Sequence, residues 1–320
     1  MSVLTDILHV IITSNFWQTT LENGALLLLP ALGGVISERS GVTNIAMEGL
    51  MLIGAFVAVD VALAWHNAWL ATIAAMIAGG LLALLHAVVS IRFKADQIIS
   101  GFGINIFAFG LTAFLAATVF GPLGAGHVEE SARLPYIKLP PQIEQIPVLG
   151  FLVQVFLEQN IIVYIAIVIL IAMQIMLFRT RLGLRIRAVG EHPQAADTAG
   201  INVYALRYGA VIMSGVLSGL AGAFLSIGVG DTFIDGMTNG RGYIALAAMI
   251  FGKWTPVGAF IGCLIFGLGT SIAASNSTLS ISQYVLEMVP YILTLVVLAG
   301  LVGRSVAPAA DGIPYEPGGE

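Results

Sequence analysis

Charged side chains are scarce in this sequence: 13 Lys and Arg and 18 Asp and Glu occur among 320 residues. Charged residues are thus 10% of the chain, against about 25% in an ordinary soluble domain. Because 58% of the residues are apolar, a water-soluble fold of this size would expose far too much apolar surface. The scarcity of charge therefore excludes a soluble globular enzyme and predicts a helical membrane protein with several spans.

Other absences narrow the class further. Cysteine occurs once, at Cys263, which excludes a disulfide scaffold. The five histidines show no spacing typical of metal ligands, so we expect no metal site. The net charge of −5 disfavours nucleic acid as a partner. Glycine, in contrast, is abundant at 37 residues, as expected where membrane helices pack closely.

Hydrophobic runs near the roughly 20 residues that cross a bilayer as a helix recur along the chain. Nine candidate spans cover residues 20–37, 45–65, 69–91, 98–120, 160–178, 208–228, 243–252, 256–275 and 283–302. We therefore predict an all-α transmembrane bundle of about nine spans over residues 20–303. An interfacial helix over 1–19 is expected to precede it, with an extra span as the alternative, and an irregular tail over 304–320 to follow.

The basic residues indicate an orientation, because they gather on the cytoplasmic side of membrane proteins. Alternating the spans places ten of the thirteen on one side and leaves only Arg133, Lys138 and Arg241 on the other. This arrangement puts the N-terminus outside and the C-terminus inside. The long loop over 121–159 then faces outward, and the loop over 179–207 faces the cytoplasm.

The seventh candidate span is unusually short. Only the stretch Lys253-Trp254-Thr255-Pro256 separates it from the eighth, which begins at this proline. A short, broken segment of this kind often marks the transport site of a transporter. A tight helical hairpin is the alternative interpretation.

The cytoplasmic loop contains a short predicted helix. Pro193 can begin a helix without losing a needed N–H, and Gly200 can end one in the left-handed conformation. Glu191 lies just before the helix start, where its charge suits the helix dipole. Such an element can dock into a groove of a partner protein. A simple linker helix on the membrane surface is the alternative.

The same loop resembles the coupling loop of permeases in ATP-binding-cassette (ABC) importers, specifically the branched-chain amino acid and simple-sugar/nucleoside permeases. Residues 37–49, 240–254 and 289–295, together with a Gly-Ile-Pro-Tyr run at 312–315, resemble the nucleoside and simple-sugar branch. One departure is His192, where the branch commonly has Asn, although a polar role at the helix N-cap would survive.

The resemblance implies a subunit that moves a nucleoside or related simple-sugar-containing solute across a bacterial or archaeal plasma membrane. Its partners would be an ATPase subunit, a second and different permease, and an extracytoplasmic substrate-binding protein. ATP and Mg would be bound by the ATPase, with no cofactor bound by this chain, which would not itself be an enzyme. In agreement, the sequence lacks the G-x-x-x-x-G-K-[ST] phosphate loop. The predicted coupling residues are Gly190, Glu191, His192, Pro193, Ala195, Ala196 and Gly200.

Polar side chains within spans are costly in hydrocarbon and are therefore candidates for the solute path. Asn44 and Glu48 are one helical turn apart on the second span and would share a face. Pairing of Glu48 with Arg39 near the cytoplasmic end is the alternative. Asn105, about midway along the fourth span, is the third candidate, with helix–helix hydrogen bonding as its alternative.

Two other functions stay open at this stage. A secondary transporter driven by an ion gradient would need a central carboxylate. An intramembrane enzyme would need a nucleophile–base pair or a metal constellation. Neither pattern is evident in the spans, whereas Gly215, Gly219 and Gly222 form a face typical of close helix contact.

Overall fold

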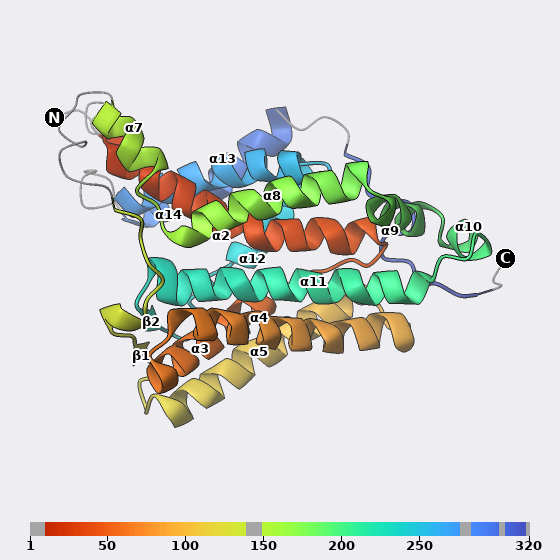
Figure 1. Ribbon diagram of the computed structural model, residues 1–320, viewed down its shortest axis with the longest axis horizontal. Coiled ribbons are helices and arrows are strands. Elements are labelled where there is room, and N and C mark those ends of the chain that lie inside the picture. Colours follow the sequence, from red (N-terminus) through yellow and green to blue (C-terminus); the bar gives the residue numbers. More distant parts are fainter. Residues whose placement is uncertain (1–9, 139–148, 276–282, 301–304, 318–320) are drawn as a thin grey trace.

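The computed structural model describes residues 10–138, 149–275, 283–300 and 305–317 and consists mostly of long helices (Figure 1). The long helices are α2 (Ser14–Arg39), α3 (Met47–Trp65), α4 (Ala68–Ala87), α5 (Gln97–Val119), α8 (Ile161–Arg179), α11 (Val203–Ala223), α13 (Pro256–Ala274) and α14 (Gln283–Gly300). Shorter helices are α7 (Leu149–Phe156), α9 (Arg181–Glu191), α10 (Pro193–Thr198) and α12 (Arg241–Phe251). Two π-helical turns, η1 (Val88–Arg92) and η3 (Phe224–Val229), extend α4 and α11, and η2 (Glu130–Ala132) is a 3-10 turn.

A helix lies at each of the nine predicted positions, so the all-α prediction is confirmed. Within the described residues, seven helices are long and apolar enough to cross a membrane. Of the other two, α12 has 11 residues and α14 has 18. The chain is therefore a polytopic helical membrane protein, while the number of nine spans and the orientation stay predictions.

The first helix begins earlier than expected. α2 starts at Ser14, six residues before the predicted first span, and runs 26 residues to Arg39. The predicted boundary between residues 19 and 20 thus falls inside this helix. Residues 1–9 of the predicted interfacial helix lie outside the described residues.

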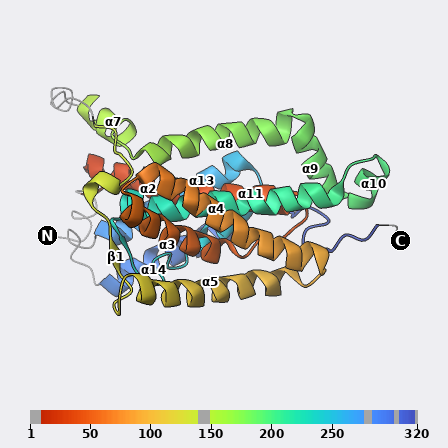
Figure 2. The same ribbon diagram turned by 60° about the horizontal axis from the view of Figure 1, so that its bottom comes forward.

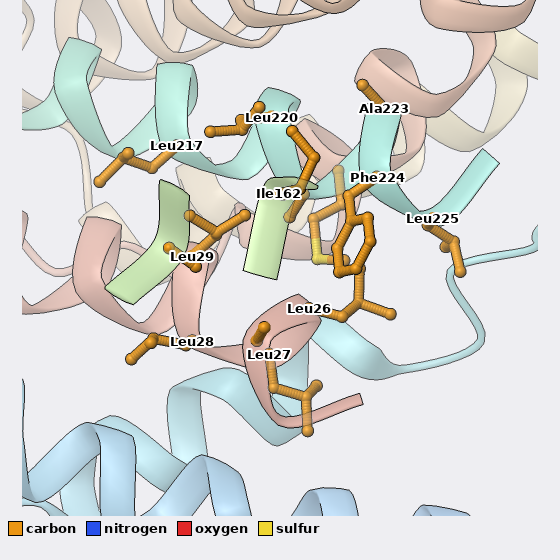
Figure 3. Packing of buried hydrophobic residues seen from close by; sticks show 14 of the residues in the cluster. Leu26, Leu27, Leu28, Leu29, Ile162, Leu217, Leu220, Ala223, Phe224 and Leu225 are labelled. Carbon is orange, nitrogen blue, oxygen red and sulfur yellow. The ribbon is translucent and has the colours of Figure 1, made fainter. Parts of the chain in front are cut away.

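α2 and α11 form the centre of the bundle. In Figure 1 they lie side by side, with α3, α4 and α5 on one side and α8, α13 and α14 on the other. Leu29 of α2 packs towards Leu217 and Leu220 of α11 and Ile162 of α8, and Leu26 lies near Phe224, whereas Leu27 and Leu28 point to the opposite side of α2 (Figure 3). The outermost long helices are α5 and α8, as the rotated view also shows (Figure 2).

α11 approaches its neighbours through the predicted small-residue face. A Cβ at Gly215 would lie 2.4 Å from the Gly79 carbonyl oxygen of α4. One at Gly222 would lie 2.1 Å from the Met51 oxygen of α3. Only glycine permits these backbone contacts, so the prediction that this face serves helix packing is confirmed.

Polar side chains cap the ends of the helices. Asp96, at the N-cap of α5, accepts a hydrogen bond from the Ile99 N–H, and Asn202 accepts one from the Ala205 N–H at the start of α11. At the end of the bundle opposite α10, β1 (Gly126–His127) pairs antiparallel with β2 (Thr232–Phe233). We call these two ends the α10 end and the β1 end.

Candidate coupling and translocation sites

The predicted helix of the 179–207 loop is present at the α10 end. α8 ends at Arg179, α9 follows after Thr180, and α10 begins with Pro193 at its first position. Gly200 has φ +77° just beyond α10, and the N–H of Ile201 donates to the carbonyl of Ala196. These contacts satisfy the last carbonyls of the helix and fix where it ends.

α10 has one buried face and one exposed face. Ala196 is buried against Val189 of α9, Val203 of α11 and Tyr315 of the tail. Ala195 and Gly200 are exposed, together with Gln194, Asp197, Thr198 and Ala199. The buried alanine anchors the helix on the bundle, and the exposed residues form a small surface open to a partner.

Two coupling-loop side chains lie differently from the sequence expectation. His192 occupies the N-cap position of α10, but its side chain makes no capping hydrogen bond among the described residues. Glu191, expected beside the helix dipole, accepts a hydrogen bond from the backbone N–H of Ala309. The helix start therefore depends on Pro193 rather than on a polar cap, and Glu191 holds the tail.

Residues 305–317 of the tail form no helix or strand and are bound along the α10 end. The Ala310 N–H donates to the Gly190 carbonyl at 2.8 Å, and the Thr43 hydroxyl donates to Asp311 Oδ1 at 3.1 Å. The Tyr315 ring lies 5.4 Å from that of Tyr204, centroid to centroid. The tail thus joins the coupling loop, α11 and the loop before α3 in one layer.

Arg207 of α11 is the buried centre of this layer. Its side chain is 1% exposed, and Nη1 donates to the Ile313 carbonyl at 2.9 Å. Within the described residues, Nε and Nη2 have no hydrogen-bond acceptor. A buried guanidinium needs a compensating negative charge. The carboxylate of Asp311, in the tail, is close enough to interact electrostatically with the Arg207 guanidinium. Burial raises the pKa of Asp311 to about 6, although the hydrogen bond from Thr43 and the positive charge of Arg207 act to lower it.

The short predicted span is α12, whose N-terminus lies against the start of α3. The two carboxylate oxygens of Glu48 accept hydrogen bonds from Gly240 N–H at 2.7 Å and Gly242 N–H at 2.6 Å. Glu48 is 1% exposed. A negative charge at this position suits the positive end of the helix dipole. Glu48 therefore caps α12, and its expected alternative partner, Arg39, contacts other groups.

Asn105 and Asn44, the other predicted path residues, are also buried and hydrogen-bonded. Asn105 Oδ1 accepts from Gly49 N–H at 2.8 Å, and its amide nitrogen donates to Ile45 O and Tyr243 Oη. Asn44 precedes α3 rather than lying on it, and its amide donates to Ser214 Oγ at 2.8 Å. The prediction that Asn44 and Glu48 share a face of one helix is therefore wrong, because α3 begins only at Met47. A role for all three in the path stays a prediction.

The other end of α12 is joined to the α10 end through α2. Arg39, the last residue of α2, donates from Nε to the Trp254 carbonyl at 2.8 Å and from Nη2 to that of Lys253. A Cβ at Gly190 would lie 2.2 Å from the Arg39 carbonyl oxygen, so α9 packs directly on this junction. Contacts thus run continuously from the coupling loop to α12.

Comparison with known proteins identifies the class. The family described as branched-chain amino acid transport system / permease component matches residues 18–299. The guanosine ABC transporter permease protein NupQ of Bacillus subtilis is 43% identical, over 92% of this chain and 94% of its own. The nucleoside ABC transporter permease protein NupC of Lactococcus lactis is 40% identical, over 90% and 92%. A putative glucose ABC transporter permease protein, TsgC13 of Haloferax volcanii, is 36% identical, over 83% and 78%. No solved structure matches this chain.

The chain belongs to this permease family. It is therefore a membrane permease subunit of an ABC importer, and the resemblance predicted from the sequence is confirmed. Membership in this family favours ATP-driven import over the ion-coupled and enzymatic alternatives.

The structure adds permease residues that the sequence did not single out. Arg207 was only one of the many basic residues expected on the cytoplasmic side, and Asp311 was only part of the irregular tail. Ile313 and Tyr315 appeared within the Gly-Ile-Pro-Tyr run that carries the resemblance, with no contact predicted for either. The available signal was a basic residue directly before the sixth predicted span, followed much later by an acidic residue in a Pro- and Gly-rich tail. It is too weak to pair the two without a structure.

Proposed function

We propose that this permease imports a nucleoside, with a separate ATPase subunit docking on α10 and an extracytoplasmic binding protein delivering the solute. The observation that carries the docking role is the exposed face of α10, fixed at one end by Pro193 and at the other by Gly200. The similarity to guanosine and nucleoside permeases over about nine-tenths of the chain supports the substrate class.

The geometry suggests how motion of the ATPase would reach the membrane. A push on α10 acts on α9 through the buried Ala196–Val189 contact. Gly190 of α9 packs against the backbone of Arg39 at the end of α2. The Arg39 side chain in turn is hydrogen-bonded to the Trp254 carbonyl, just after α12. Packed helices shift as units rather than deforming smoothly. A displacement of α10 would therefore move α12 and the polar groups at its N-terminus.

A neutral solute suits this arrangement. The N–H groups at the start of α12, which would otherwise attract an anion, are already satisfied by Glu48. The same carboxylate is satisfied by those N–H groups and does not present a free charge to a cation. This favours a nucleoside or a sugar over a charged amino acid.

Uptake by the whole transporter, reconstituted in proteoliposomes with its partner subunits, tests the proposal. We expect radiolabelled guanosine to accumulate in the vesicles when ATP is supplied on the side of the membrane that carries the ATPase. This uptake should stop when the ATPase is inactivated and should continue in the presence of an uncoupler. Glucose should compete poorly. Uptake abolished by the uncoupler alone would contradict ATP coupling, and preferred accumulation of glucose would contradict the substrate.

The docking role of α10 is tested with Gly200→Val. Valine strongly disfavours the positive φ of this position, so the end of α10 should distort and less ATPase should co-purify. Gly209→Val is the matched control, since Gly209 of α11 has no atom within 4 Å of its Cβ position and lies in regular helix. Equal ATPase recovery from the two variants would contradict docking at α10.

A further inference from the structure

The irregular segment 234–240, which joins β2 to α12, lies beside the middle of a transmembrane helix. Phe233 contacts Phe120, at the end of α5, with ring centroids 6.3 Å apart. A Cβ at Gly236 would lie 3.7 Å from the Phe109 ring, and Tyr243 is hydrogen-bonded to Asn105. Phe109 and Asn105 lie near the middle of the 23-residue α5. The segment therefore enters the depth of the membrane from the β1 end and reaches α12 there.

Backbone of this kind is not compatible with lipid. In hydrocarbon, unsatisfied backbone groups are so costly that irregular segments occur only where protein covers them or where they line water. Three turns satisfy part of this backbone, with N–H groups of Met237, Asn239 and Arg241 donating to the carbonyls of Ile234, Gly236 and Thr238. Even so, the side chains of Ile234, Asp235 and Asn239 are exposed.

Aromatic rings lie next to these polar groups. The Tyr243 ring on the first turn of α12 is 38% exposed and the Phe102 ring of α5 is 47% exposed. Their centroids are 6.4 Å apart and the planes are inclined by 32°. The hydrogen bond of 2.9 Å from Asn105 to Tyr243 Oη holds the tyrosine in place. Two adjacent, partly exposed rings form a platform on which a flat heteroaromatic ring can stack.

We infer that Asp235, Asn239, Phe102 and Tyr243 form one wall of the solute path, with the aromatic pair for a nucleobase and the polar pair for sugar hydroxyls. This inference rests on the proposed function and deepens it. In this arrangement Glu48 and Asn105 are positioning residues: they hold α12 and Tyr243 from behind the wall. The solute would therefore contact the exposed wall residues, and not the buried side chains of Glu48 and Asn105 that were predicted to line the path.

Accessibility to a charged thiol reagent tests whether the segment lines water. Asp235→Cys and Asn239→Cys are made in a Cys263→Ala background, Cys263 being fully buried, and the complete transporter in native membranes is treated with a membrane-impermeant methanethiosulfonate. We expect both cysteines to react. Ile77→Cys on the apolar surface of α4, 56% exposed, should stay unreacted, and Glu129→Cys, exposed in the loop between β1 and η2, should react from the aqueous side. Failure of both segment cysteines to react in every nucleotide state, while Glu129→Cys reacts, would overturn the inference.

The solute class is tested at the aromatic pair. We expect Tyr243→Leu and Phe102→Leu each to raise the KM for guanosine about tenfold, the loss expected when a base loses its stacking partner. The KM for a free sugar, where it is transported, should hardly change. Tyr243→Phe keeps the ring and should keep most of the affinity. Equal effects of Leu and Phe at Tyr243, or no protection of Asn239→Cys by guanosine, would overturn the nucleobase platform.

Failure of the inference and failure of the proposed function give different results. If the transporter imports glucose and not guanosine, the substrate proposal and the nucleobase platform both fail, while the thiol reactivity of the segment is independent of the solute. If guanosine is imported but the segment cysteines never react, the proposed function stands and the path lies elsewhere.

Discussion

Two stretches of this permease without helix or strand, the tail at the α10 end and the segment 234–240, differ in how their backbone groups are hydrogen-bonded. The tail is tied to helices by side chains and backbone groups of other elements, including Arg207, Thr43 and Gly190. The segment 234–240 is held mainly by turns of its own and by Arg241, whose guanidinium donates to the carbonyls of Met237 and Thr238. The tail therefore acts as part of the structure, whereas the segment leaves polar side chains exposed at membrane depth.

We expect the largest loss of transport from substitution of Glu48, because this one buried side chain accepts the hydrogen bonds of two N–H groups at the start of α12. Glu48→Leu removes both acceptors from the buried N–H groups of Gly240 and Gly242. With a cost of about 1–3 kcal/mol for each unsatisfied group, we expect a loss of about 4 kcal/mol in stability. The thermal midpoint of the detergent-solubilised permease should fall clearly, and guanosine uptake should be lost.

Glu48→Gln is the matched control for that change. Its amide keeps one acceptor oxygen and nearly the same shape, so at least half of the thermal stability should return. If Glu48→Leu were as stable as the unmodified permease, the start of α12 would not depend on this carboxylate.

At the α10 end, the largest expected effect comes from the buried arginine. Arg207→Met leaves the Ile313 carbonyl without its donor and Asp311 without its facing cation. Breaking a buried ionic contact from one side is strongly destabilising, but Arg207 and Asp311 interact without a direct ion pair, so we expect about 2 kcal/mol. Limited proteolysis should then cleave the tail faster.

The double variant Arg207→Met, Asp311→Asn separates the charge interaction from packing. If Arg207 and Asp311 interact as a pair, the double variant should lose less stability than the two single variants together, by about 1 kcal/mol. Simple additivity would show that the tail is held by its backbone contacts alone.

The sequence was informative wherever a local pattern determines the structure. Hydrophobic runs located every long helix, and the Pro193–Gly200 spacing predicted α10. Gly215 and its neighbours predicted a packing face. Each of these features depends on residues within a few turns of one another, which is the range over which helix periodicity and capping act.

The sequence failed where partners are far apart in the chain. Glu48 meets Gly240 and Gly242 across more than 190 positions, and Arg207 meets Ile313 across 106. Asn44 was expected on a helix because residues 45–65 are apolar, but α3 begins only at Met47. An isolated polar residue in an apolar run indicates that something contacts it, without indicating what.

The tail should also respond to pH through Asp311, which faces Glu38, Arg207 and Thr43. Burial raises the pKa of Asp311 from its ordinary value of 3.8 to about 6, so the docked tail favours the protonated carboxyl. Docking is therefore strongest below pH 3.8, weakens as the pH rises towards 6 and is constant above it. Between pH 5 and 7 we expect a loss of about 1 kcal/mol in docking free energy. Proteolysis of the tail at the two pH values measures it, and Asp311→Asn should abolish the difference.

The smallest effects should come from the exposed contact of the tail, and they distinguish burial from charge as the cause of docking. Lys94 and Glu316 form an ion pair of 2.6 Å, but both side chains are exposed, at 39% and 61%. Water screens such a pair and side-chain freedom opposes it, so Lys94→Ala should leave the thermal midpoint and tail proteolysis unchanged. Thr43→Val, which removes a partly buried hydrogen bond to Asp311 and keeps the side-chain shape, should accelerate tail cleavage measurably. If Lys94→Ala had the larger effect, surface charge rather than the layer around Arg207 would hold the tail.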